Sequence, residues 1–167
     1  MELTYEKARK WLDTYFEDVN RNQGSIEVVP NLKKYFTADF EFWMYTGRAS
    51  MTRPLHRDRF LVLFVHPGLH ETLTPQYYVV DVRQMIVVVQ FEVRFVDQLS
   101  GTAWPPKQAS AHYHLVFDEN EEPKIKKIQY WTESFEPEVF ASMYSSWDDY
   151  REKALMSLAI DYINEKS

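Results

Sequence analysis

One long alternating stretch, Met85–Val96, constrains the fold more than any other segment of the chain. From Val87 to Phe95 every odd-numbered residue is apolar, whereas the even-numbered positions become polar at Gln90, Glu92 and Arg94. Successive side chains of a strand point to opposite faces, so this period of two predicts a strand with one buried face. The run is also longer than the usual strand of about five or six residues. We therefore interpret it as the central strand of a curved antiparallel sheet.

Length and composition bound the classes of protein to which this chain can belong. The 167 residues predict a single domain, since a chain of this size can bury a substantial core. Hydrophobic residues make up 45% and aromatic residues 16% of the chain, so we expect some rings to line a cavity. The absence of cysteine excludes disulfides and thiolate sites and is typical of a reducing compartment.

Charge and hydropathy narrow the partners of the protein. No run approaches the roughly 20 apolar residues of a membrane span, and the N-terminus is too charged for a signal peptide. A net charge of −6 argues against nucleic acid as the main partner, because such binders need a basic face to neutralise phosphates. We therefore expect a soluble cytoplasmic protein that uses neither membrane nor nucleic acid and contains no metal or other cofactor.

Three helices are expected before the organising strand. Apolar residues at helical spacing predict a helix over Leu3–Val19, with Thr4 as its N-cap and Asn22–Gly24 as its end. A proline in the first turn predicts a short helix over Pro30–Phe36. A third helix is expected to begin at Pro54 and to end before the Pro67-Gly68 pair, which breaks helices.

Further strands follow the period of two. The first is predicted where Phe40, Phe42 and Met44 alternate with Glu41, Trp43 and Tyr45. The turn at Asp81–Gln84 stays open at this stage, because the strand before it could also run straight on. The other strands are expected at Tyr77–Val82, Ala109–Phe117 and Lys124–Phe135.

The chain returns to helical spacing after Pro137. A capping box is expected where Asp149 follows Ser146 by three residues, at the start of a terminal helix. No internal repeat, low-complexity segment or linker divides the chain.

This order of elements resembles the nuclear transport factor 2-like superfamily, which includes SnoaL-like polyketide cyclases and steroid delta-isomerases. The residues that carry the resemblance are Tyr15–Gly24, Tyr35–Phe40 and Lys124–Trp131. The resemblance implies an α+β cone, in which N-terminal helices pack on a strongly bent antiparallel sheet of about five strands and enclose an apolar pocket. It implies one domain over residues 1–167, with the cone at 3–135 and a C-terminal helical extension at 137–166.

The resemblance also implies positions for catalytic residues. The steroid isomerases place a carboxylate base at the end of the first strand, a tyrosine on helix one and a second acid on a late strand. Tyr15 matches the helix-one tyrosine and Tyr113 the late-strand acid, whereas Met44 occupies the base position and cannot take a proton. Scytalone dehydratase-like members use pocket histidines, and His70 lies near such a position. Its ordinary pKa suits acid–base work, although a loop histidine at the rim or in solvent is the simpler interpretation.

A wall of apolar and aromatic side chains is expected around these groups. A simple core would use the same residue types, and the two tyrosine hydroxyls could equally be satisfied by backbone or water. The expected wall comprises Trp11, Phe40, Phe42, Met44, Phe60, Phe64, Phe91, Val93 and Tyr130.

A second polar group, His112 with His114, is expected on the outer face of the sheet. Residues two apart share a strand face, so the two imidazoles could bind a metal with Glu92 as a third ligand. The alternative, a polar outer face or a dimer contact, is favoured because two histidines on their own are a common coincidence. We therefore predict no metal site.

Two functions follow as hypotheses. The first is a protein that binds a small, largely apolar molecule and carries out proton transfer, namely isomerisation, dehydration or cyclisation of a cyclic or polyketide-like substrate. The second is a non-catalytic, dimeric protein-interaction module of the same fold, favoured by the missing base at Met44 and by the C-terminal helices. The resemblance implies a homodimer in either case.

Overall fold

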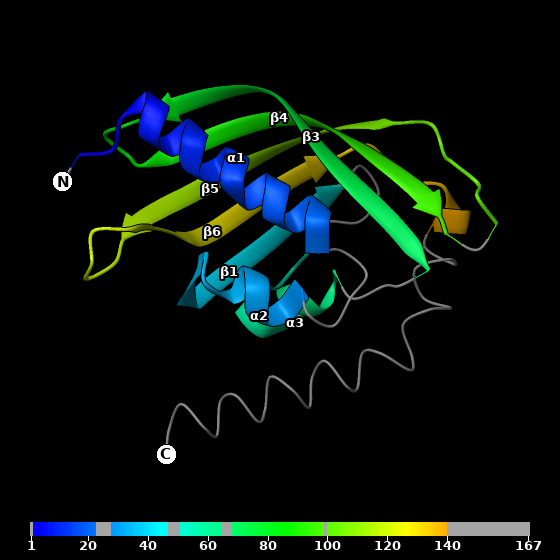
Figure 1. Ribbon diagram of the computed structural model, residues 1–167, viewed down its shortest axis with the longest axis horizontal. Coiled ribbons are helices and arrows are strands. Elements are labelled where there is room, and N and C mark those ends of the chain that lie inside the picture. Colours follow the sequence, from blue (N-terminus) through cyan, green and yellow to red (C-terminus); the bar gives the residue numbers. More distant parts are fainter. Residues whose placement is uncertain (1, 23–27, 47–50, 65–67, 99, 140–167) are drawn as a thin grey trace, which may run out of the picture.

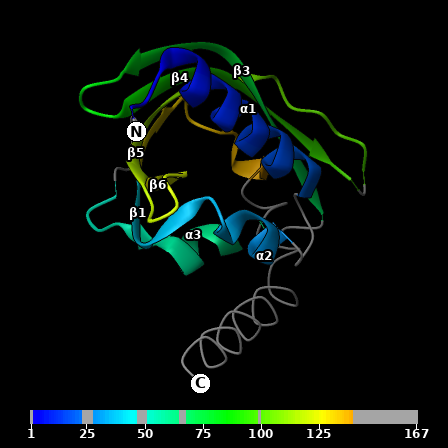
Figure 2. The same ribbon diagram turned by 60° about the vertical axis from the view of Figure 1, so that its left-hand side comes forward.

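The computed structural model describes residues 2–22, 28–46, 51–64, 68–98 and 100–139. Six strands form one sheet in the order β2-β1-β6-β5-β4-β3, and three helices lie on its concave side (Figures 1 and 2). The elements are α1 (Tyr5–Asn22), α2 (Val28–Lys33), β1 (Phe36–Thr46), β2 (Leu55–His56), α3 (Arg57–Val62), β3 (Leu69–Asp81), β4 (Ile86–Asp97), β5 (Lys107–Phe117) and β6 (Pro123–Thr132).

The expected N-terminal helices are confirmed, with shifted ends. The Thr4 hydroxyl accepts a hydrogen bond from the Lys7 amide at 3.1 Å, which is the predicted cap of α1. The stop expected at Asn22–Gly24 lies partly outside the described residues. α2 begins two residues before Pro30, and α3 is shorter than expected, since it starts at Arg57.

The organising strand is confirmed as β4, and its odd-numbered side chains from Val87 to Phe95 are buried. The prediction that this strand is central is wrong, because β4 lies next to the edge strand β3 and the two middle strands are β6 and β5. β1 also pairs with β6 in parallel, so the sheet is mixed and not antiparallel throughout. Strand order depends on pairing between distant segments, which a local alternation of side chains does not encode.

β3 extends well beyond the predicted strand at Tyr77–Val82, because it already begins at Leu69. Pro75 and a register shift between Pro75 and Tyr77 interrupt the alternation. A proline is tolerated here because β3 is an edge strand. The open question at Asp81–Gln84 is resolved in favour of a turn: the Asp81 carboxylate accepts hydrogen bonds from two backbone amides, those of Arg83 and Gln84, at 3.0 Å each.

The C-terminal helical extension predicted for 137–166 lies outside the described residues except for 137–139. The capping box at Ser146 lies there too, so the extension and the single-domain assignment stay predictions. Within the described ranges, none of the helices combines the length and apolar character needed to cross a bilayer.

Candidate functional site

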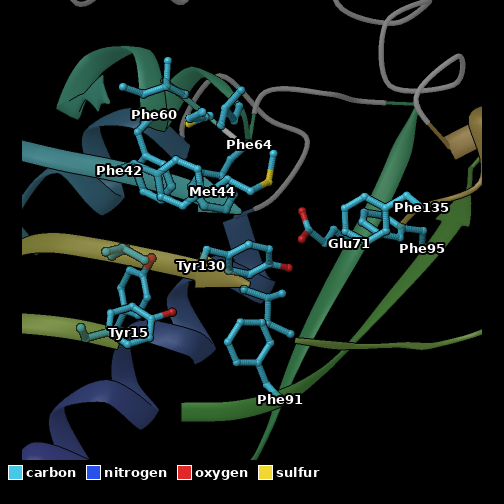
Figure 3. A pocket seen from close by; sticks show the side chains of 16 residues that line it. Tyr15, Phe42, Met44, Phe60, Phe64, Glu71, Phe91, Phe95, Tyr130 and Phe135 are labelled. Carbon is cyan, nitrogen blue, oxygen red and sulfur yellow. The ribbon is translucent and has the colours of Figure 1, made fainter. Parts of the chain in front are cut away.

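A cavity of about 270 Å³ lies on the concave side of the sheet, between the strands and the helices (Figure 3). Sixteen of the described residues line it, of which nine are aromatic and one, Glu71, is an acid. The lining consists of Tyr15, Phe42, Met44, Met51, Leu55, Phe60, Leu63, Phe64, Glu71, Leu73, Phe91, Phe95, Tyr113, Ile128, Tyr130 and Phe135. A concave apolar pocket with a few polar groups is the usual form of a small-molecule site, and this volume is near the lower end of the usual range.

Most of the predicted wall lines this cavity, and three predicted residues do not. Phe40 is fully buried against Phe36 and Phe60, with ring centroids 4.7 and 5.1 Å away, so it fills the core beside the cavity. Val93 is likewise fully buried without lining the cavity. Trp11 packs edge-on against a tyrosine of the α2–β1 connection and is outside the lining. The predicted wall residues that line the cavity are Phe42, Met44, Phe60, Phe64, Phe91 and Tyr130.

Tyr15 and Tyr113 come together in the cavity, as the resemblance implied. Their ring centroids lie 6.0 Å apart in an edge-to-face arrangement, and both side chains are almost completely buried. Tyr15 comes from the inward face of α1, and Tyr113 from the inward face of β5, between Ala111 and Leu115. Burial raises the pKa of both hydroxyls far above the ordinary value for tyrosine. Both phenols therefore stay protonated and can donate hydrogen bonds at any ordinary pH.

Glu71 is the polar residue of the cavity that sequence reasoning missed. It lies on β3 opposite Phe95, on the inward face of the sheet, and burial in apolar surroundings raises the pKa of its carboxyl to about 7. The pKa values of Tyr15 and Tyr130 are raised mainly by burial and next by the negative charge of the Glu71 carboxylate. The Glu71 charge therefore acts on both hydroxyls. Leu69, Glu71 and Leu73 follow the period of two, but the interruption at Pro75 hid this part of the strand.

His70, the predicted acid–base residue, lies on the other face of the same strand. Its backbone pairs with Val96, one register position away from the Glu71–Phe95 pair, and it is not among the lining residues. Side chains of neighbouring strand residues point to opposite faces, so the structure does not bring His70 together with Tyr15.

Comparison with known proteins bears on the fold. Neither a protein-family model nor a curated protein matches the sequence. Solved structures do match. AusH from Aspergillus nidulans aligns with a TM-score of 0.62 at 8% identity, over 80% of this chain and 88% of that one. ActVI-ORFA from Streptomyces coelicolor aligns with a TM-score of 0.57 at 11% identity, over 77% of this chain and 96% of that one. Nuclear transport factor 2 from Cryptosporidium parvum aligns with a TM-score of 0.56 at 11% identity, over 76% of this chain and 92% of that one. The chain has the nuclear transport factor 2-like fold.

The Asn20 side chain attaches the edge strand of this nuclear transport factor 2-like sheet to α1. The Asn20 amide donates to the carbonyl of Leu73 at 2.8 Å, and its oxygen accepts from the amide of Leu73 at 2.9 Å. An edge strand leaves backbone groups unpaired on one side, and here the carboxamide takes the place of a neighbouring strand. Because Asn20 follows Tyr15 on α1 and Leu73 follows Glu71 on β3, the bridge holds together the two elements that carry these polar groups.

The outer face of the cone carries His112 and His114, as predicted. The His114 ring contacts the Gln129 amide oxygen at 2.9 Å, and the His112 ring packs against Trp131 with centroids 4.6 Å apart. The third ligand considered from the sequence, Glu92, pairs with Gln108 further along the sheet, so that metal geometry is wrong. Among the residues described, His, Asp and Glu form no group of three that could hold a metal ion.

Proposed function

We propose that the protein binds a small, largely apolar molecule in the cavity and carries out proton-transfer chemistry on it. The reactions that fit are isomerisation, dehydration or cyclisation of a cyclic or polyketide-like compound. The observation that carries the proposal is the cavity itself: about 270 Å³, walled by aromatic rings, with a few polar groups pointing inward. Tyr15 and Tyr113 would orient a polar atom of the ligand, because both remain hydrogen-bond donors.

The first test is native mass spectrometry of the purified protein beside its denatured mass. An organic adduct that dissociates on denaturation supports an open ligand-binding cavity, and its mass and fragments identify the compound class. The second test is binding of 2-naphthol, a compact apolar phenol, to wild-type protein and to Tyr15→Phe and Tyr113→Phe variants.

Each phenylalanine variant is expected to weaken 2-naphthol binding by roughly tenfold, the effect of losing one hydrogen bond. Tyr77→Phe is the matched control, because Tyr77 is 57% exposed and lies on the outer face of the sheet. Unchanged affinity in both cavity variants would count against the roles given to the two hydroxyls.

The second candidate function is a dimeric interaction module, and exposed apolar groups on the outer face favour it. Tyr77 and Val79 are each 57% exposed and Trp131 is 37% exposed, and the ring of Trp131 stacks on Tyr45 at 5.1 Å. Across the strands Val79 lies opposite Val88, which continues the apolar surface onto β4. If this face joins two copies as a homodimer, Val79→Lys should yield monomers in light scattering, while His56→Lys, at an exposed position on β2, should not.

A further inference from the structure

We propose that Glu71 takes and returns the proton in the cavity, and that its substrate is an uncharged ketone with a hydrogen on the carbon beside the carbonyl. This inference rests on the proposed function and assigns the acid–base residue that the family resemblance did not supply. That resemblance expects a base at the end of β1, where Met44 stands, whereas Glu71 comes from a different strand, β3.

The position of Glu71 is the first argument. Its side chain projects from β3 into the cavity, and in Figure 3 its carboxyl and the hydroxyl of Tyr130 on β6 are turned toward the same part of that space. Tyr15 enters the cavity from α1, and in Figure 3 its ring lies apart from Glu71, with Tyr130 between them. A ligand in this space would therefore meet the Glu71 carboxyl beside the Tyr130 hydroxyl, and the Tyr15 hydroxyl further along the cavity.

The charge of the lining is the second argument. Among the described residues, none of the sixteen that line the cavity is lysine, arginine or histidine. A ligand carboxylate would find no counter-charge among these side chains and would be repelled by ionised Glu71, so an anion is disfavoured. A neutral ketone avoids this cost, because its oxygen can accept hydrogen bonds from the phenols and its carbon skeleton can pack against the rings.

The strength of the base is the third argument. Burial holds the pKa of Glu71 at about 7, so its ionised form is a stronger base than an exposed glutamate and is still populated at neutral pH. In the step itself the C–H bond breaks, and its electron pair forms a carbon–carbon double bond. The carbonyl pair moves to oxygen, where the phenols donate to it, and the proton moves to the Glu71 carboxylate. Return of that proton to the same carbon, or to a conjugated one, restores the carboxylate and leaves an exchanged or isomerised ketone.

The test measures deuterium exchange at the carbon between the ring and the carbonyl of 2-tetralone in D₂O by proton NMR. Wild-type protein is compared with Glu71→Gln, which keeps the shape of the side chain and removes the base. His70→Gln is the matched control, since it is the next residue on the same strand and lies on the other face. Binding of 2-naphthol, which resembles the enol of 2-tetralone and does not exchange carbon-bound hydrogen in this way, reports whether each variant keeps its cavity.

The expected result is that wild-type protein and His70→Gln catalyse exchange, while Glu71→Gln loses about 100-fold or more of the rate and still binds 2-naphthol. Glu71→Ala should recover exchange when formate is added, because formate can enter the space left by the side chain. Exchange that persists in Glu71→Gln, or wild-type binding of 2-naphthol without exchange, overturns the role of Glu71 and leaves the ligand-binding proposal standing. Failure of wild-type protein to bind either compound overturns both proposals.

Discussion

Two neighbouring residues, His70 and Glu71, show how one position along a strand decides which side chain reaches the cavity. Histidine attracts attention in a sequence because its ordinary pKa lies near neutrality. Glutamate does not, since its ordinary pKa is well below 7. Glu71 reaches a pKa of about 7 only through burial. The face of β3 that turns inward is fixed by its register with β4, where Glu71 lies opposite Phe95.

At the scale of this residue, stability should depend on the protonation of Glu71. Its pKa is raised from 4.5 to about 7 on folding, so between these values the folded protein holds a proton that the unfolded chain has lost. The contribution of the Glu71 proton to the free energy of unfolding is complete below pH 4.5 and disappears as the pH rises through 7. Its upper limit is about 3 kcal/mol. We expect Glu71→Gln to be more stable than wild type at pH 8, by urea unfolding, and to approach wild type at pH 5. A stability difference between the two proteins that does not change with pH would contradict this assignment.

At the scale of elements, the attachment of α1 to β3 by Asn20 matters most for the site. The two hydrogen bonds join residues 53 positions apart, which no local pattern in the sequence indicates. Tyr15 on α1 was predicted from resemblance, but its distance from Glu71 depends on how the helix lies against the edge strand. Asn20 is thus a positioning residue for the cavity and does not line it.

Asn20→Ala should remove both hydrogen bonds and leave the amide and carbonyl of Leu73 without this partner. The expected loss is about 1–3 kcal/mol in the free energy of unfolding, measured by urea denaturation. Amide hydrogen exchange should accelerate at Leu73 more than elsewhere in β3. Glu17→Ala, an exposed substitution on the same helix, is the control and should change stability by less than about 0.5 kcal/mol. Equal exchange at Leu73 in the two variants would show that the bridge does not hold this edge.

At the scale of the whole molecule, the pairing of β1 with β6 joins β2 and β1 to the other four strands of the sheet. It joins Phe42 to Ile128 and brings the first strand in the chain beside the last. The helices α2 and α3 pack against each other, and α3 packs on β1, so this pairing also places the wall of the cavity that contains Phe60. One continuous core therefore serves both the fold and the site.

Ile125→Ala tests how far the whole core depends on this strand pairing. Ile125 is fully buried on β6, and its truncation should cost about 2–5 kcal/mol, in a single unfolding transition seen alike by tryptophan fluorescence and far-UV circular dichroism. Lys126→Ala, the exposed neighbour, should cost little, because its side chain points to solvent and makes one weak ion pair with Asp39 at 3.9 Å. Two separate transitions would show that the sheet does not unfold as one unit.

Local spacing in the sequence predicted most of the elements and the inward faces of β4 and β5, because these depend on side chains a few residues apart. The cap at Thr4, the buried face of Val87–Phe95 and the inward side of Tyr113 all follow from such local spacing. The resemblance added the cone and the place of Tyr15. Only the tertiary structure decided strand order, the parallel pairing of β1 with β6, and the raised pKa of Glu71. These properties arise from contacts between distant segments and from the partial removal of water around Glu71 in the cavity, and residues adjacent in the sequence do not indicate either.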